Sequence, residues 1–193
     1  MALAMGAGGI LYGFILPEFF IARIMWVLPA SLIAVGLGFV LHEMAHKLTA
    51  QHYGYWSEFR YDGRGLLMAL FFAVILGFVW AAPGATWVSG NPSRRENGIM
   101  SFAGPVINMV IAGGLLSFLF VLEFDTYIWN TIAISGFIIA FLAVFNMLPI
   151  HPLDGSKVWR WNKLIYIFGI VIAGAMTIFY YIAAFTYLYF PLS

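Results

Sequence analysis

The sequence has 193 residues, of which 63% are hydrophobic and 9% are charged, and its mean hydropathy is +0.95. A soluble globular domain carries roughly 25% charged residues, so this composition indicates an integral membrane protein. The net charge is +1 with no basic block, which excludes nucleic acids and acidic polymers as partners. Cysteine is absent, so disulfides and thiol nucleophiles are excluded, and any metal must be held by His, Asp or Glu.

Apolar stretches define the candidate membrane spans, because a bilayer core about 30 Å thick requires about 20 helical residues. The candidates are residues 1–16, 24–41, 99–122, 128–148 and 164–189. The first of them has no basic flank of the kind that begins a secretory signal, so we expect it to stay in the membrane. A sixth stretch, residues 66–88, is long enough to cross once but is interrupted by Pro83 and Gly84.

The positions of Lys and Arg bear on whether residues 66–88 cross, because cytoplasmic loops accumulate these residues. If the stretch does not cross, eight of the nine positive residues share one side and only Arg23 lies opposite. If it crosses, this bias largely disappears. The charges therefore favour a re-entrant or β-like hairpin around residues 66–88, and an ordinary span is the alternative.

The expected fold is an all-α polytopic membrane protein with five or six transmembrane helices and this short hairpin. We expect a single domain over residues 1–193 with no separate soluble domain. The longest polar stretch, residues 47–65, is most simply a solvated cytoplasmic loop. Its charged and titratable residues include His52, Glu58, Arg60, Asp62 and Arg64.

The second candidate span ends in the segment His42-Glu43-Met44-Ala45-His46. Residues four apart on a helix project from one face, and this spacing lets two imidazoles bind one zinc ion. Glu43 lies beside them, where a carboxylate can take a proton from metal-bound water and pass it to a leaving amine. The alternative is a polar helix end at the interface, although ionisable groups at this depth are costly without a partner such as zinc.

Asp154 is the candidate for a third ligand, since a catalytic zinc usually has three protein ligands and one water. It follows the fourth candidate span, where Pro149 and Pro152 must end the helix and Gly155 permits a turn. The histidine pair can share a metal with Asp154 only if an even number of crossings separates them, as in the topology with the hairpin. The alternative is that Asp154 caps a following helix at Ser156.

Three sequence motifs occur in a recognisable order along the chain. The first is the segment at residues 42–46, and the second is Gly104-Pro105-Val106-Ile107-Asn108. The third contains Asn146, Pro149, Pro152 and Leu153-Asp154-Gly155. Together they resemble the site-2 protease family of intramembrane zinc metalloproteases, whose Gly-Pro-x-x-Asn segment the second motif matches. The resemblance covers about residues 27–161, and the three motifs together are far more specific than any one alone.

The resemblance implies one zinc ion per chain, held by His42, His46 and Asp154. It also implies that Glu43 is the catalytic acid/base, and it suggests that Asn146 holds the substrate backbone or the developing oxyanion. Residues 83–88 would offer an edge to an extended substrate. The activity implied is hydrolysis of peptide bonds in or near transmembrane helices of membrane-protein substrates, as in regulated intramembrane proteolysis.

Two residues near the motifs have open roles. His151 stands where a hydrophobic residue is more usual in the family, so it is either a fourth nitrogen ligand or a loop residue near the mouth of the site. Asn108 lies inside the third candidate span. It is either a helix-packing amide or a site group that contacts the substrate or the oxyanion.

The expected partners are the lipid bilayer and a transmembrane protein substrate that enters laterally between helices. The expected location is the cell membrane, with several spans and with the active site near the cytoplasmic side. Two other functions remain open at this stage. One is a membrane transporter or metal carrier that uses the same His and Asp residues, and the other is a catalytically silent, protease-like binding protein.

Overall fold

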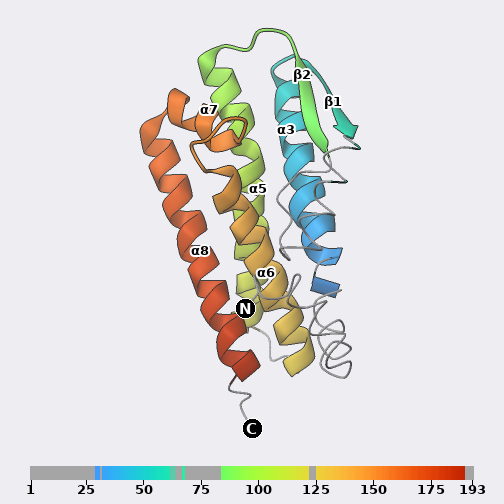
Figure 1. The fold of residues 1–193 in the computed structure, drawn as a ribbon, viewed down its shortest axis with the longest axis vertical. Helices are drawn as coiled ribbons and strands as arrows, with labels where there is room; N and C mark the ends of the chain where they lie inside the picture. Colours follow the sequence, from blue (N-terminus) through green and yellow to red (C-terminus); the bar gives the residue numbers. More distant parts are fainter. Residues whose placement is uncertain are drawn as a thin grey trace.

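Long helices run side by side along the longest axis of the computed structural model (Figure 1). The structure describes residues 29–30, 32–61, 63, 67, 84–121 and 125–189. The predicted span at residues 1–16 lies outside the described residues, as does most of the predicted hairpin segment.

Among the described residues, three helices are long and apolar enough to cross a membrane. They are α5 (Arg94–Val121), α6 (Thr126–Asn146) and α8 (Lys163–Tyr189). They coincide with the last three candidate spans read from the sequence, because an apolar run of this length leaves the backbone only its own hydrogen bonds. Asp125 starts α6 as its N-cap, with its carboxylate accepting a hydrogen bond from the amide of Ile128 at 2.9 Å.

The described part of the second candidate span is helical and leads directly into the first motif. A π-helix, η2 (Ala34–Val40), precedes α3 (Leu41–His52), so the wider turn ends just before the first histidine. Short π-helical segments inside helices often mark functional sites. The helix ends through Gly54, whose φ of +81° is the left-handed conformation that glycine adopts freely, and the chain then turns into the first strand.

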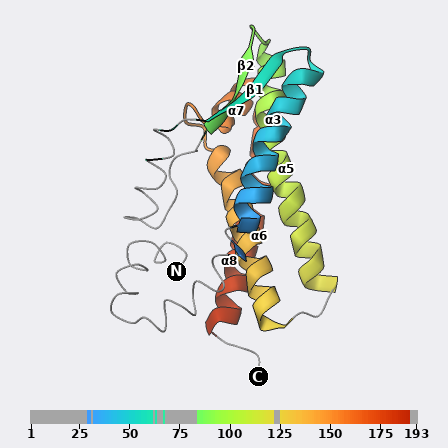
Figure 2. The ribbon, with the colours of Figure 1, turned by 90° about the vertical axis from the view of Figure 1, so that its right-hand side faces the viewer.

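A two-stranded antiparallel sheet lies beside α3 at one end of the molecule (Figure 2). Strand β1 (Trp56–Tyr61) pairs with β2 (Gly84–Ser89), from Trp56 opposite Ser89 to Tyr61 opposite Gly84. The expected loop at residues 47–65 is therefore wrong over β1, and it is also wrong over residues 47–52, which continue α3. The charged residues of β1 lie on the outer face of the sheet, where the guanidinium of Arg60 lies 4.8 Å from the ring centre of Trp87.

Strand β2 overlaps the end of the segment predicted as a hairpin, but its partner strand lies before that segment. Because Tyr61 and Gly84 are paired, the chain leaves the sheet and returns to it at the same place. The start of α5 is tied to the same end of the molecule. Ser93 and Glu96 exchange hydrogen bonds in a capping box, and the Tyr55 hydroxyl donates to Glu96 at 3.0 Å.

Small residues allow α5, α6 and α8 to approach closely, as is usual for helices packed in membranes. The buried centre of this packing includes Ala112 of α5, Ile139 of α6 and Tyr180 of α8. A Cβ on Gly136 of α6 would collide with the Tyr180 ring, and the Tyr180 hydroxyl donates to the Ala112 carbonyl at 2.6 Å. Tyr180 therefore links all three helices.

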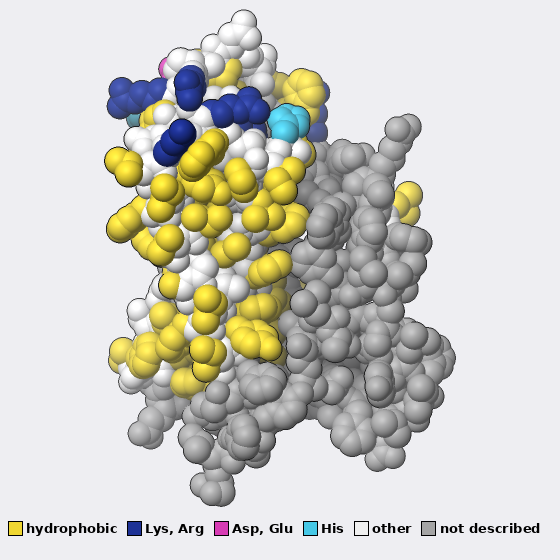
Figure 3. Space-filling view, turned by 60° about the vertical axis from the view of Figure 1, so that its left-hand side comes forward, with side chains coloured by type: hydrophobic (Ala, Val, Ile, Leu, Met, Phe, Trp, Pro, Cys, Tyr) yellow, Lys and Arg dark blue, Asp and Glu magenta, His cyan; other side chains and the backbone are white. Residues whose placement is uncertain are grey.

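Positive side chains gather at the end of the molecule that carries the sheet and the short helix α7 (Asp154–Trp161), above a largely apolar surface (Figure 3). The described Lys and Arg residues are Lys47, Arg60, Arg94, Arg95, Lys157, Arg160 and Lys163. The Lys163 ammonium lies 5.1 Å from the ring centre of Trp159. Paired aromatic and basic residues are typical of a membrane–water interface.

Candidate metal centre

Helix α3 presents His42 and His46 on one face, one turn apart, as their spacing requires. Their ring centroids lie 4.7 Å apart and the two rings are nearly perpendicular. His42 is buried, with 2% of its surface exposed, and His46 is half-buried. Both imidazoles therefore point into the protein, where a polar ring needs a partner.

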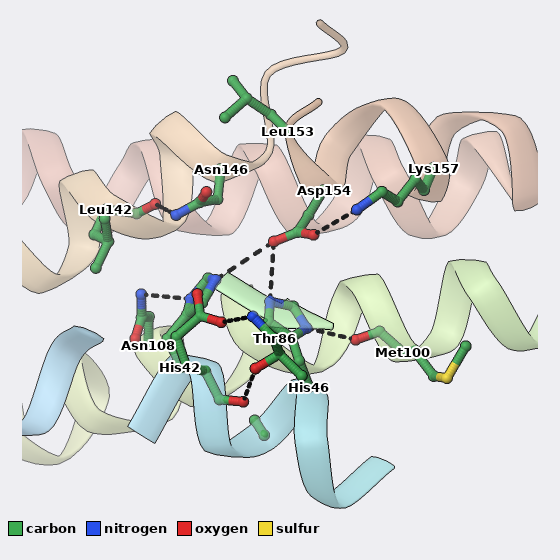
Figure 4. A network of polar contacts seen from close by, with 12 residues as sticks. His42, His46, Thr86, Met100, Asn108, Leu142, Asn146, Leu153, Asp154 and Lys157 are labelled. Atoms are coloured by element: carbon green, nitrogen blue, oxygen red, sulfur yellow. Dashed lines mark hydrogen bonds and ion pairs between the residues drawn. The ribbon is translucent and has the colours of Figure 1, made fainter. Parts of the chain in front are cut away.

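Asp154 meets the two histidines from the opposite side (Figure 4). Its Oδ2 lies 3.4 Å from Nε2 of His42 and 3.1 Å from Nε2 of His46. The segment between α6 and α7 brings it there: α6 ends at Asn146, and α7 begins at Asp154 itself. A Cβ on Gly155 would collide with the carbonyl of Met147, so glycine lets α7 start directly against the end of α6.

Asp154 does not cap α7, which rejects the alternative role predicted from the sequence. The N-cap residue is Leu153, without a side-chain cap, and the carboxylate of Asp154 contacts the imidazoles and the Lys157 ammonium at 3.5 Å. Burial raises the pKa of Asp154. The charge of His46, hydrogen bonds from both imidazoles and the charge of Lys157 outweigh burial, and they hold that pKa well below its ordinary value. Asp154 is therefore anionic at neutral pH.

Helix α5 fixes which nitrogen of each histidine faces the centre. Nδ1 of His46 lies 2.7 Å from the Met100 carbonyl, which can only accept, so Nδ1 carries a proton and Nε2 is the nitrogen that would bind a metal once its own proton is lost. Nδ1 of His42 lies 3.1 Å from the side-chain amide of Asn108. The oxygen of this buried amide has no partner among the described residues. Rotating the amide by half a turn places that oxygen on Nδ1–H and leaves Nε2 for a metal.

Gly104 of α5 gives the imidazoles their space. A Cβ at this position would lie 2.5 Å from Nε2 of His46 and 2.6 Å from Nε2 of His42. No carbon atom fits at these distances, so the glycine of the second motif is required where α5 passes the first motif. The close passage of α5 is what brings Met100 and Asn108 within reach of the two Nδ1 atoms.

Glu43 lies next to the histidines and is held by strand β2. Its Oε2 accepts a hydrogen bond from the amide of Thr86 at 2.8 Å, and its main-chain carbonyl accepts one from the Thr86 hydroxyl at 3.0 Å. The carboxylate is thus oriented by the sheet rather than by its own helix.

The residues present fit a zinc ion. Two imidazole nitrogens and one carboxylate oxygen lie within 4.8 Å of one another, and within the described ranges no other group of three such side chains is found. This donor set is typical of a catalytic zinc with one open position. The hydrogen bonds on both Nδ1 atoms and the space at Gly104 are further conditions that a metal at this centre requires.

Comparison with known proteins identifies the family. The chain is 42% identical over 152 residues to "Putative zinc metalloprotease MJ0611" of Methanocaldococcus jannaschii, and the alignment covers 76% of this chain and 78% of the relative. The chain belongs to the site-2 protease family of zinc metalloproteases. A second relative of this family, "Putative zinc metalloprotease Rip2" of Mycolicibacterium smegmatis, is 31% identical over 129 residues. That alignment covers 60% of this chain and 50% of the relative, so the chain spans half of the Rip2 protein.

No protein-family profile matches the chain, and no solved structure matches it. The two relatives confirm the resemblance to the site-2 protease family and, with the three clustered side chains, the prediction of zinc. The three helices able to cross a membrane agree with a membrane-bound member of this family.

The structure places the other predicted residues of this site-2 protease as follows. Asn108 contacts Nδ1 of His42, so it lies beside the centre. Asn146 ends α6, and its amide donates to the Leu142 carbonyl of its own helix at 3.0 Å. His151 is exposed and is not one of the three residues whose ligand atoms converge.

Three contacts of the site were not anticipated from the sequence. The Met100 carbonyl is a main-chain group, so no residue type could have pointed to it. Thr86 lies in a segment expected to serve an extended substrate, and no local signal links it to Glu43, 43 positions earlier. The third contact, between Lys157 and Asp154, could have been predicted, because the two residues are three apart and such pairs meet on a helix.

Proposed function

We propose that this chain is an intramembrane zinc endopeptidase that hydrolyses peptide bonds in or near transmembrane helices of membrane-protein substrates. The observation that carries the proposal is the convergence of His42, His46 and Asp154 on a centre that contacts α5 and lies just beyond the end of α6, two helices apolar enough to cross a membrane. A water-soluble protease does not need such helices around its metal ligands. A site placed there can receive substrate segments from the bilayer.

The proposed topology is multi-pass, with the active site near the cytoplasmic side of the cell membrane. The gathering of the described Lys and Arg residues at the end that carries the metal centre supports this orientation. The pairing of Tyr61 with Gly84 supports a segment that leaves and returns on one side, because its two ends are neighbours. With the two N-terminal candidate spans, the three observed helices would give five crossings and a re-entrant segment.

Each residue of the centre has a proposed task in hydrolysis. When bound, zinc supplies the Lewis acidity that polarises the scissile carbonyl and activates a water molecule. Glu43 takes a proton from that water and passes it to the leaving amine. The carboxylate of Asp154 and the Nε2 atoms of His42 and His46 would hold the metal. Asn146 uses one N–H on the Leu142 carbonyl, and its second N–H is left to donate to the substrate carbonyl oxygen.

The proposed substrate is a transmembrane segment that approaches laterally and is locally unwound. A helix hides its amides in its own hydrogen bonds, so helix-breaking residues in the substrate should favour cleavage. Strand β2 would receive the unwound segment along the edge that β1 leaves open. The Thr86 amide points away from β1, and main-chain groups alternate along a strand, so those of Gly84 and Val88 also face this edge.

Metal analysis combined with cleavage of a transmembrane peptide tests the proposal. We expect the purified wild-type protein to contain about one zinc per chain and to cut the peptide in detergent or vesicles. Glu43→Gln should retain the zinc and lose at least about 100-fold in cleavage rate, since it removes the proton acceptor. His151→Ala serves as the matched control and should retain both zinc and cleavage.

Two results would reject the proposed function. Cleavage by Glu43→Gln at the wild-type rate would remove the assigned acid/base. Zinc uptake into sealed vesicles without any cleavage would instead favour a transporter built on the same side chains.

A further inference from the structure

Thr86 makes two hydrogen bonds to a single residue, Glu43. Its amide donates to one carboxylate oxygen, Oε2, at 2.8 Å, and its hydroxyl donates to the main-chain carbonyl of Glu43 at 3.0 Å. Both ends of the glutamate, its backbone and its carboxylate, are thus fixed by one residue of strand β2. Figure 4 shows Thr86 beside α3, with the dashed lines of these contacts.

The register of the sheet leaves the Thr86 amide available for this contact. Thr86 stands opposite Phe59, and its amide is directed to Glu43 instead of to β1. The two residues therefore form a non-hydrogen-bonded pair of the antiparallel ladder. A shift of the register by one residue would turn this amide toward β1 and the side chain away from α3. The contact depends on the pairing of β1 with β2 and not on β2 alone.

A residue of the other strand, Ser57, makes one hydrogen bond of the same kind, from a side-chain hydroxyl to a main-chain carbonyl of α3. The Ser57 hydroxyl of β1 donates to the carbonyl of Lys47 at 3.0 Å, one helical turn beyond Glu43. Both strands are therefore fastened to successive turns of α3 by a hydroxyl on a helix carbonyl. Of the two, only the Thr86 contact also includes a carboxylate, so the strand residues differ in what they can do beyond fastening.

We propose that Thr86 is a positioning residue that sets the orientation of the Glu43 carboxylate for proton transfer. A glutamate side chain rotates about three bonds, and a general base must lie within hydrogen-bond reach of its proton. With Oε2 held by a rigid main-chain amide, Oε1 is left as the proton acceptor and faces one direction. The assignment rests on the proposed function, because it concerns the base of that reaction.

Substitutions at Thr86 and Ser57 distinguish two roles: orienting the Glu43 carboxylate, and attaching a strand to α3. Thr86→Val removes the hydroxyl and keeps the shape of the side chain, and we expect kcat to fall about 3- to 10-fold with KM and zinc content unchanged. Thr86→Ser should restore kcat to within about twofold of wild type. Thr86→Pro removes the amide proton at a position outside the ladder, and a larger loss of roughly 10- to 100-fold in kcat is expected. Ser57→Ala loses the same kind of hydroxyl bond and should keep the wild-type kcat.

Hydrogen exchange tests the contact without any cleavage assay. Selective ¹⁵N labelling of threonine reports the Thr86 amide, which we expect to exchange slowly in wild type and at least about 10-fold faster in Glu43→Ala. The amide of Thr177, which lies in α8, serves as the internal control and should be unchanged by the substitution.

Each proposal fails in its own way. If the wild-type protein does not cleave, the proposed function fails, and the exchange rate of the Thr86 amide still decides whether the contact exists. If the wild type cleaves but Thr86→Val and Ser57→Ala lose kcat equally, Thr86 only fastens the strand and the positioning role is wrong. An exchange rate that does not respond to Glu43→Ala would also overturn it.

Discussion

Two glycines of the helix bundle, Gly104 in α5 and Gly136 in α6, each leave room for an aromatic ring of a neighbouring helix. At Gly104 the space is filled by the imidazoles of His42 and His46, and at Gly136 it is filled by the ring of Tyr180. The backbone solution is the same in both places. The space at Gly104 admits two side chains that can bind a metal. The space at Gly136 admits the Tyr180 ring, which links three helices, so a glycine serves the metal centre at one place and helix packing at the other.

Two buried asparagines show the same contrast. The Oδ1 atoms of Asn108 in α5 and Asn130 in α6 both lack a partner among the described residues, but the Asn108 amide also contacts Nδ1 of His42. Burying an amide costs free energy unless it is paired. For Asn108 that cost is offset by the contact with Nδ1 of His42, which orients the imidazole. The comparison predicts that equivalent substitutions at the two sites will change different properties.

The largest expected effect is that of Gly104→Ala. The added methyl group would lie within 2.6 Å of both Nε2 atoms, so the imidazoles must move away from Asp154. We expect zinc affinity to fall at least about 100-fold, measured by competition with a metal chelator, together with loss of cleavage. Gly136→Ala is the matched control: it should retain zinc and lose about 1–3 kcal/mol of stability through overpacking against Tyr180. Equal zinc affinity in the two variants would remove the distinction between the glycines.

An intermediate effect is expected for Asn108→Ala. The substitution removes the group that orients the Nδ1 side of His42, and loss of such a partner typically lowers metal affinity about 10- to 100-fold. Zinc titration of the purified protein measures this. Asn130→Ala removes a similarly buried amide away from the centre, and its zinc affinity should match that of wild type. A wild-type affinity in Asn108→Ala would show that the amide only packs.

The smallest effect is expected for Tyr180→Phe. It deletes the hydroxyl that donates to the Ala112 carbonyl while keeping the ring against Gly136. The free energy of unfolding should fall by about 0.5–1.5 kcal/mol, as for one buried hydrogen bond, which denaturant titration in detergent can measure. Zinc content and cleavage should stay at the wild-type level. A loss of zinc here would mean that the packing region and the metal centre are coupled.

Much of the fold could be predicted because its signals are local. The helices α5, α6 and α8 follow from apolar runs of sufficient length, and the end of α6 follows from Pro149 and Pro152. Strand β1 could not be found in this way, because Glu58 and Arg60 read as a solvated loop. Those side chains belong to the outer face of the sheet, and only the pairing with β2 stabilises the extended chain.

For the metal centre, the sequence by itself determined the ligand types and the spacing of the histidine pair. A four-residue interval on a helix places two side chains on one face whatever surrounds them. The tertiary structure decided how Asp154 meets that face, which nitrogen of each imidazole is free, and that Thr86 holds Glu43. These contacts join residues separated by 43 to more than 100 positions, so they depend on how α3, α5, α7 and the sheet pack together and not on any local pattern.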